Sequence, residues 1–151
     1  MTERKPPKQI QPSSLNDYLE VMSKAVFQTG MSWRVVESKW PHIKEAFQNF
    51  DVEKVAAFDD HDLRRLVEDK RVIRNFRKLS AIVSNAKKMA ALASEHRSFT
   101  AYLRSHSEFS DTINAMKKDF KFMGPTACYY FLYVVGEKVP PHHEFEATYR
   151  K

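Results

Sequence analysis

The sequence contains few of the residues that form tight turns or covalent cross-links. Among its 151 residues are three glycines and one cysteine, Cys128. So few glycines argue against a β-rich fold with many tight turns, and one cysteine excludes a disulfide framework or a multi-cysteine zinc site. No apolar run reaches the roughly 20 residues that a membrane helix needs, and the N-terminus lacks the apolar core of a signal peptide. We therefore predict a cytoplasmic protein with no membrane partner.

Large apolar side chains and positive charge are plentiful. The chain has 11 Phe, 6 Tyr and 2 Trp, 42% of its residues are hydrophobic, and its net charge is +6. These apolar residues are enough for the core of one domain. A basic domain is typical of proteins that bind nucleic acid, or sometimes an anionic membrane.

Apolar residues recur at helical spacing along most of the chain, which predicts an all-α fold. A first helix is expected from Leu15 to about Thr29, where Gly30 ends it, and a longer amphipathic helix from Val72 to about Ser94. Pro41 is expected to bend or restart the second helix, because proline cannot continue the hydrogen-bond ladder. Further helix starts are predicted at side chains that can cap a helix: Ser32, Asp51, Asp59 or Asp60, and Ser98.

Three regions follow from composition. Residues 1–13 are polar with three prolines and predict a flexible leader. Residues 14–136 form the helical domain. Residues 137–151, which include Pro140 and Pro141, are predicted to be an irregular tail.

The stretch 111–136 predicts a helix, a tight turn at Gly124 and a second, apolar helix that begins near Pro125. Free main-chain amides at the start of the second helix attract an anion, and Met123, Gly124 and Thr126 could supply them. Lys121 adds positive charge. Such a helix-hairpin-helix motif can hold a nucleic-acid phosphate without reading sequence. The alternative is an ordinary αα-hairpin that binds nothing.

Four stretches, in this order, resemble one family: F-Q-T-G-M-S-W at 27–33, K-W-P-H-I-K-E-A-F-Q-N-F-D-V-E-K-V-A at 39–56, L-V-E-D-K-R-V-I-R-N-F-R-K-L-S-A-I-V-S-N-A at 66–86, and M-K-K-D-F-K-F-M-G-P-T-A-C-Y-Y-F at 116–131. Together they resemble the DNA-3-methyladenine glycosylase I family, within the helix-hairpin-helix glycosylase superfamily. The resemblance implies a bilobal, all-helical fold with a base pocket between the lobes. It also implies cleavage of the N-glycosidic bond of an alkylated adenine flipped out of duplex DNA.

The resemblance assigns roles to particular residues. Trp33 matches the aromatic residue that stacks on the flipped base, although a core tryptophan is the alternative, and Tyr18 is a further candidate for base binding. Gly30 and Met31 match the loop that approaches the vacated stack, with Met31 as an apolar wedge. The residues that match the phosphate-binding hairpin are Lys121, Phe122, Met123, Gly124 and Thr126.

The acidic residues depart from the family pattern. The family's base-recognising glutamate aligns with Ala25, so the catalytic group is unknown, and Glu20 and Glu37 are weak candidates. The superfamily's catalytic aspartate follows the hairpin, where this chain has only Glu137 and Glu144. We therefore expect weak or narrow activity on alkylated purines, or none.

The family's zinc site needs two cysteines and two histidines. His142 and His143 lie near the family's histidine position, but the partner cysteine is missing. We expect no metal site and no cofactor, and a solvated tail is the alternative role for the two histidines.

Two functions from different classes follow. The first is a monofunctional glycosylase that removes 3-methyladenine without cutting the strand. The second is a catalytically weakened or inactive protein of the same fold that binds DNA. An RNA- or protein-binding helical domain is a third possibility. For the first two functions we expect duplex DNA with a damaged base as the partner, and a monomeric protein.

Overall fold

The computed structural model describes residues 7–149, which contain helices and no strand. The helices are α1 Leu15–Gln28, α2 Trp33–Ala46, α3 Val52–Ala56, α4 Asp60–Glu68, α5 Phe76–Glu95, α6 Phe99–Leu103, α7 Phe109–Asp119, α8 Pro125–Val134 and α9 His142–Tyr149, with a three-residue turn η1 at Gln48–Phe50. Within these residues, no helix has both the length and the apolarity to cross a membrane. The all-α prediction is confirmed.

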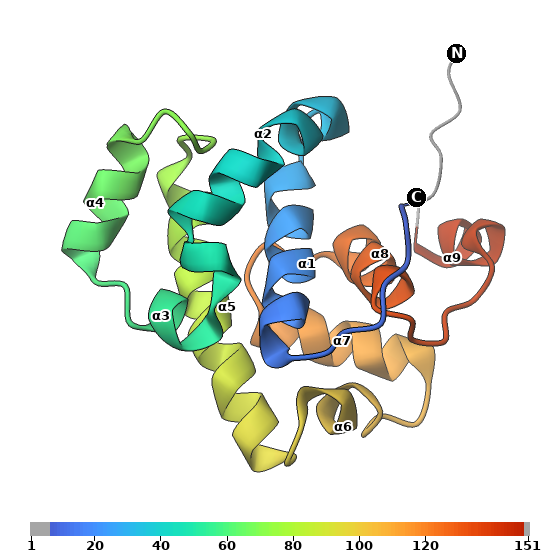
Figure 1. Ribbon diagram of the computed structural model, residues 1–151. Helices are drawn as coiled ribbons and strands as arrows, with labels where there is room; N and C mark the ends of the chain where they lie inside the picture. The colour runs from blue at the N-terminus through green and yellow to red at the C-terminus, as the bar shows by residue number, and fades with distance from the viewer. Residues whose placement is uncertain (1–6, 150–151) are drawn as a thin grey trace.

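The fold has two lobes that meet at α1. Helices α2–α5 lie on one side of α1, and α6–α9 lie on the other (Figure 1). Helix α1 contacts α2 and α5 in one lobe and α8 in the other. The bilobal prediction is therefore confirmed, and α1 is the helix that both lobes share.

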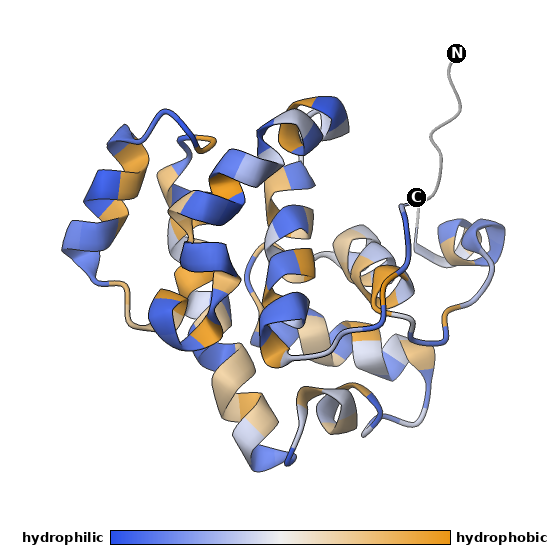
Figure 2. Ribbon diagram, viewed as in Figure 1, coloured by the Kyte–Doolittle hydropathy of each residue, from blue (hydrophilic) through white to orange (hydrophobic). Residues whose placement is uncertain are grey.

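Buried aromatic rings fill the core around α1. Phe27, Phe47, Phe50 and Phe131 are fully buried. The Trp40 ring stacks on Phe50 at 5.3 Å, which joins α2 to the turn that follows it. Figure 2 shows apolar and hydrophilic residues alternating along the helices, as amphipathic helices require.

Local capping sets several helix starts as predicted. Side-chain oxygens of Ser32, Asp51, Asp59 and Ser98 each accept a hydrogen bond from a main-chain amide in the first turn. The long helix starts later than expected, at Phe76 instead of Val72, because Asn75 caps it. Helix α2 continues through Pro41, so the predicted restart does not occur.

The C-terminal tail was predicted to be irregular, and this is wrong for residues 142–149. They form α9, whose Phe145 is 4% exposed and stacks on Tyr129 of α8 at 4.4 Å between ring centroids. The Tyr129 hydroxyl donates to the Pro140 carbonyl at 2.8 Å and ties down the connection before α9.

The described part of the leader also contacts the folded domain. The Ile10 amide donates to the Val134 carbonyl at 2.8 Å, and the Gln9 side chain donates to the Tyr133 carbonyl at 2.9 Å. Both acceptors lie at the C-terminal end of α8. Part of the predicted leader thus lies against the domain, and its flexibility stays a prediction; residues 1–6 lie outside the described residues.

Candidate functional site

A cavity of about 740 Å³ lies between the leader and helices α1, α2 and α8. This volume is within the usual range for small-molecule sites, so the cavity has room for a purine. Its walls include Ala25 of α1, Trp33 of α2, Tyr130 of α8 and Ile10 of the leader. The cavity lies where the two lobes meet, as the resemblance implied for a base pocket.

Trp33 is the first residue of α2 and forms part of the cavity wall. The Ser32 hydroxyl accepts from the Val35 amide at 3.4 Å and fixes the helix start. The half-buried indole meets the Tyr130 ring edge-on, with centroids 5.3 Å apart and an interplanar angle of 83°. This position is compatible with stacking on a base, and the stacking role stays a prediction.

Both candidate carboxylates line the cavity, and both already have partners. Glu20 accepts from the Trp40 indole at 2.9 Å and pairs with Lys44 at 3.1 Å. Glu37 pairs with Lys24. A third acid, Asp17, was missed in the sequence; it also lines the cavity and accepts from the Ser13 amide at 2.8 Å.

Ala25 lines the cavity and is 8% exposed. The resemblance aligns this position with the family's base-recognising glutamate. The structure therefore places a methyl group on the wall where that alignment expects a carboxylate.

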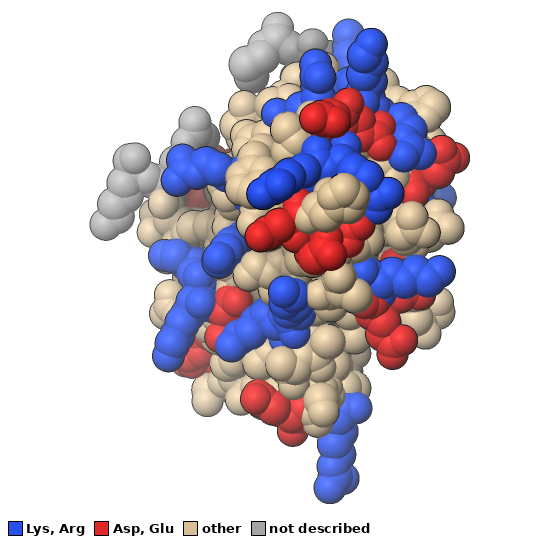
Figure 3. Space-filling model, turned by 90° about the vertical axis from the view of Figure 1, so that its left-hand side faces the viewer, with Lys and Arg blue, Asp and Glu red and all other residues tan. Residues whose placement is uncertain are grey.

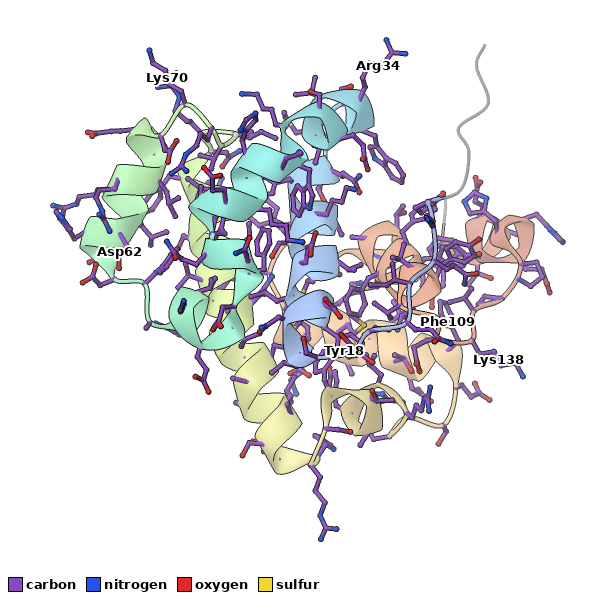
Figure 4. The ribbon with its side chains drawn as sticks, viewed as in Figure 1. Tyr18, Arg34, Asp62, Lys70, Phe109 and Lys138 are labelled. Atoms are coloured by element: carbon purple, nitrogen blue, oxygen red, sulfur yellow. The ribbon has the colours of Figure 1, made fainter. Side chains whose placement is uncertain are left out.

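Tyr18 does not line the cavity, and its candidate role in base binding is not supported. It is 8% exposed, its ring meets Phe99 at 5.1 Å, and its hydroxyl lies 2.7 Å from Thr100 Oγ1. Figure 4 shows Tyr18 at one end of α1 and Arg34, which follows Trp33, projecting at the other end. Along α1, Tyr18 and the last helical residue, Gln28, are about 15 Å apart at 1.5 Å per residue. Tyr18 joins the lobes as a core residue.

The loop between α1 and α2 contains the predicted wedge. Gly30 has φ +71, a conformation that favours glycine. Met31 is half-buried and packs against the core, so its side chain does not project freely. The Lys78 ammonium, from α5, donates to the carbonyls of Phe27 and Thr29 and thereby holds the end of α1 just before this loop. Lys78 is 5% exposed, and burial lowers its pKa.

We expect Lys78→Met to lower the free energy of unfolding by about 1.5–3 kcal/mol, because it removes charge-assisted hydrogen bonds and leaves buried carbonyls unpaired. Urea unfolding measures this change. Arg77→Met is the matched control: Arg77 is exposed on the same helix, and its loss is expected to change stability by no more than about 0.5 kcal/mol. Equal stability of the two variants would show that Lys78 does not hold the loop.

Helices α7 and α8 form the predicted hairpin, but its strained residue differs from expectation. Gly124 has φ −74, which any residue can adopt, and Phe122 has φ +59. Asn85 of α5 holds the turn: its side chain donates to the Lys121 carbonyl at 3.1 Å and accepts from the Lys121 amide at 2.8 Å. A buried asparagine outside the motif therefore fixes the turn, and the sequence did not reveal this.

The hairpin surface suits an anion. Lys121, Phe122, Gly124 and Thr126 are exposed, whereas the Met123 side chain is 3% exposed and belongs to the core. Met123 can therefore contribute only its main chain. Within residues 7–149, the amides of Phe122, Met123, Gly124 and Thr126 donate no hydrogen bond. They remain available to an incoming phosphate, although that role stays a prediction.

Positive charge is balanced elsewhere on the surface. Figure 3 shows Lys and Arg interspersed with Asp and Glu on the face that includes α4. There Arg71 pairs with Asp69 at 2.7 Å and with Glu45 at 2.8 Å, and its guanidinium lowers the pKa of Asp69. This face has no patch of one sign to attract DNA, which favours the hairpin.

No group of three or more His, Cys, Asp or Glu side chains within residues 7–149 is arranged to hold a metal ion. Cys128 is fully buried in α8, and burial raises the pKa of its thiol to about 12. His142 contacts Glu146 at 3.0 Å and Tyr130 at 3.1 Å, and its side chain is 48% exposed, so the histidines lie on a helix but remain solvated, as the alternative role expected. Glu137 pairs with Arg104 at 3.0 Å and does not line the cavity.

Comparison with known proteins gives the same family from sequence. A model of the methyladenine glycosylase family matches residues 12–119, more than half of the chain. DNA-3-methyladenine glycosylase 1 of Escherichia coli (strain K12) is 42% identical over 55 residues, 36% of this chain. That match spans 29% of the length of the Escherichia coli protein.

Solved structures share the fold over most of the chain. A crystal structure of 3-methyladenine DNA glycosylase I has a TM-score of 0.73 at 26% identity, covering 84% of this chain and 81% of that one. The Staphylococcus aureus enzyme, solved to study 3-methyladenine recognition, has a TM-score of 0.74 at 23% identity, covering 85% and 80%. A solution structure of 3-methyladenine DNA glycosylase I has a TM-score of 0.69 at 28% identity, covering 86% and 79%.

Proposed function

Because the chain belongs to the methyladenine glycosylase family, we propose that it hydrolyses the N-glycosidic bond of 3-methyladenine flipped out of duplex DNA. The observation that supports this most is Trp33 on the wall of a purine-sized cavity between the lobes. The hairpin, with its unengaged amides, would grip the DNA backbone, and the Gly30–Met31 loop would approach the vacated stack.

The chemistry demands little of the protein. In 3-methyladenine the base is cationic, so when the C1′–N9 bond breaks its electron pair neutralises the departing base. Water adds to C1′ and gives up a proton to solvent. The cavity needs only to hold the base and exclude bulk water, which Trp33 and Tyr130 can do by their ring contact.

The contacts of the carboxylates on the cavity wall are consistent with a modest rate of base release. Glu20 and Glu37 are paired with cations, and Asp17 accepts from Ser13. General acid or base assistance contributes about 10²–10⁴ in rate. Without a carboxylate at Ala25, we propose that these acids assist little and that bases which leave readily are released fastest.

The second candidate is a DNA-binding protein without chemistry, and the methyl group of Ala25 on the cavity wall favours it. In that case the hairpin still binds duplex DNA. The proposal for either function includes a monomer, a cytoplasmic location, a duplex DNA partner and no zinc.

The test is product analysis after incubation with methylated duplex DNA, with and without a chelator. We expect free 3-methyladenine, an intact strand at the abasic site, and no effect of the chelator. Loss of release on chelation would contradict the zinc-free proposal. Salt-dependent binding without release would favour the second candidate.

Lys121→Glu is expected to weaken duplex binding equally for all sequences. Its side chain is exposed and its main chain is held by Asn85, so the substitution should leave the hairpin folded. Loss of one phosphate contact should reduce the slope of log affinity against log salt by about 0.9. Fluorescence anisotropy at several salt concentrations measures both.

Lys138→Glu is the control, since it changes net charge equally at the connection to α9, where Figure 4 shows Lys138. Identical slopes of log affinity against log salt for the two variants would show that the hairpin is not part of the DNA interface.

A further inference from the structure

Three side chains form a line from α9 to the cavity. Glu146 Oε1 lies 3.0 Å from His142 Nδ1, and His142 Nε2 lies 3.1 Å from the Tyr130 hydroxyl. Tyr130 forms part of the cavity wall and its ring meets Trp33. A carboxylate, an imidazole and a hydroxyl are thus joined through the two different nitrogens of one ring. This is the arrangement in which a carboxylate orients an imidazole for proton exchange with a hydroxyl.

We propose that Glu146, His142 and Tyr130 form a proton relay at the cavity wall, and that this relay assists departure of an uncharged purine base. The inference rests on the proposed function, because it assumes that a flipped base enters this cavity. It extends the substrate class from cationic bases to uncharged ones.

The charges of the cavity support an uncharged substrate. Each wall carboxylate already has a partner: Asp17 accepts from Ser13, Glu20 pairs with Lys44, and Glu37 pairs with Lys24. The Lys24 ammonium also lies 5.6 Å from the centroid of the Trp40 ring, on the same wall. With Ala25 in place of a carboxylate, the cavity wall lacks the negative charge that the family alignment expects beside a cationic base. An uncharged purine loses less by entering such a site.

The position of His142 is fixed by packing. Phe145, one turn along α9, stacks on Tyr129 at 4.4 Å and meets Phe109 of α7 at 6.3 Å. The Tyr129 hydroxyl holds the Pro140 carbonyl at 2.8 Å, two residues before His142. Contacts before and after His142 therefore hold α9 in place, and they fix the position of the imidazole next to Tyr130.

A water molecule balances the proton transfers when an uncharged base is released. When the C1′–N9 bond of an uncharged purine breaks, its electron pair goes to the base, which takes a proton from the Tyr130 hydroxyl. The phenol oxygen regains a proton from Nε2 of the His142 imidazolium, and Glu146 retains its hydrogen bond to Nδ1. Water adds to C1′ and loses a proton, which restores the imidazolium. A cationic base leaves without this proton and gains less from the relay.

The relay works when His142 is protonated and Glu146 is ionised. Among residues 7–149, the titratable groups in contact with His142 are Glu146 on its own helix and Tyr129 and Tyr130 on α8. From α7, the apolar Phe109 packs against Phe145 of the same helix as His142. With neutral imidazole, the Tyr130 hydroxyl donates to Nε2 and is not available to the base.

The experiment compares single-turnover release of two bases from matched duplexes, one with 3-methyladenine and one with hypoxanthine, an uncharged purine of similar size. The proteins are the wild type, Tyr130→Phe, His142→Gln and Glu146→Gln, with His143→Gln as the control because His143 is exposed on the same helix. Thermal unfolding confirms that each variant is folded. The quantity measured is the ratio of the hypoxanthine rate to the 3-methyladenine rate.

We expect His143→Gln to keep the wild-type ratio, and Tyr130→Phe and His142→Gln to lower the ratio about 100-fold. If 3-methyladenine is released but hypoxanthine is not, or if the ratio is unchanged in Tyr130→Phe, the relay is wrong and the proposed function stands. If neither base is released, both the proposed function and the relay are wrong.

Discussion

Trp33→Ala is expected to lower the rate of 3-methyladenine release about 10- to 100-fold, while affinity for undamaged duplex changes less than about twofold. Stacking on an aromatic ring is worth about 1–3 kcal/mol per base. The substitution removes the indole that meets the Tyr130 ring edge-on, with centroids 5.3 Å apart. Undamaged DNA keeps its bases stacked and does not enter the cavity. Base-release kinetics and duplex titrations measure the two effects separately.

Trp33→Phe is the matched variant, because it retains an aromatic face at the start of α2. It should recover most of the release that Trp33→Ala loses. If Trp33→Ala loses equal affinity for damaged and undamaged DNA, Trp33 stabilises the fold or the DNA-binding surface and does not stack on the flipped base.

Asn85→Leu is expected to destabilise the protein by about 1–3 kcal/mol and to weaken duplex binding. Asn85 is 1% exposed, and its loss leaves the amide and carbonyl of Lys121 without their partners. The turn with φ +59 at Phe122 then lacks the contact that holds it, so the amides that would bind phosphate lose their fixed geometry. Chemical unfolding and anisotropy measure the two effects.

Tyr102→Phe separates stability from binding in that experiment. It removes a partly buried hydrogen bond of 2.7 Å between the Tyr102 hydroxyl and Asp119, the last residue of α7, and leaves the two hydrogen bonds between Asn85 and Lys121 in place. Tyr102→Phe should destabilise the protein without changing duplex affinity. If both variants weaken binding in proportion to their loss of stability, Asn85 has no separate role in shaping the hairpin.

Features that depend on neighbouring residues were predictable. Ser32, Asp51 and Ser98 cap the helices they were predicted to cap, since capping is decided within four residues. The hairpin helices were found because Pro125 and the apolar run after it define a helix start locally.

Features that depend on distant contacts were not predictable. The two prolines before His142 favoured an irregular tail, but the stacking of Phe145 on Tyr129 stabilises α9. Gly124 was expected to take the strained conformation, but Asn85, distant in sequence, imposes it on Phe122. Helical stability in proteins comes mostly from such packing.

In the candidate site, too, features set by the local sequence were predictable and features set by distant contacts were not. The resemblance identified Trp33, and the acids nearest to it in the sequence pattern, Glu20 and Glu37, were weak candidates; the structure places all three on one cavity. It gave no reason to choose Tyr130 or Asp17, because their contributions depend on how α8 and the leader pack against α1. Tyr18 has the right chemistry for base binding but lies in the core with Phe99 and Thr100.

The most direct test of the central claim is the single-turnover rate of 3-methyladenine release from methylated duplex DNA, compared with spontaneous loss of the base without protein. A cavity that holds the base without a carboxylate at Ala25 predicts a rate well above the spontaneous one, unchanged by a chelator and sharply reduced in Trp33→Ala. A rate equal to the spontaneous one, at protein concentrations that saturate the DNA, would contradict the claim and leave a protein that binds DNA without excising the base.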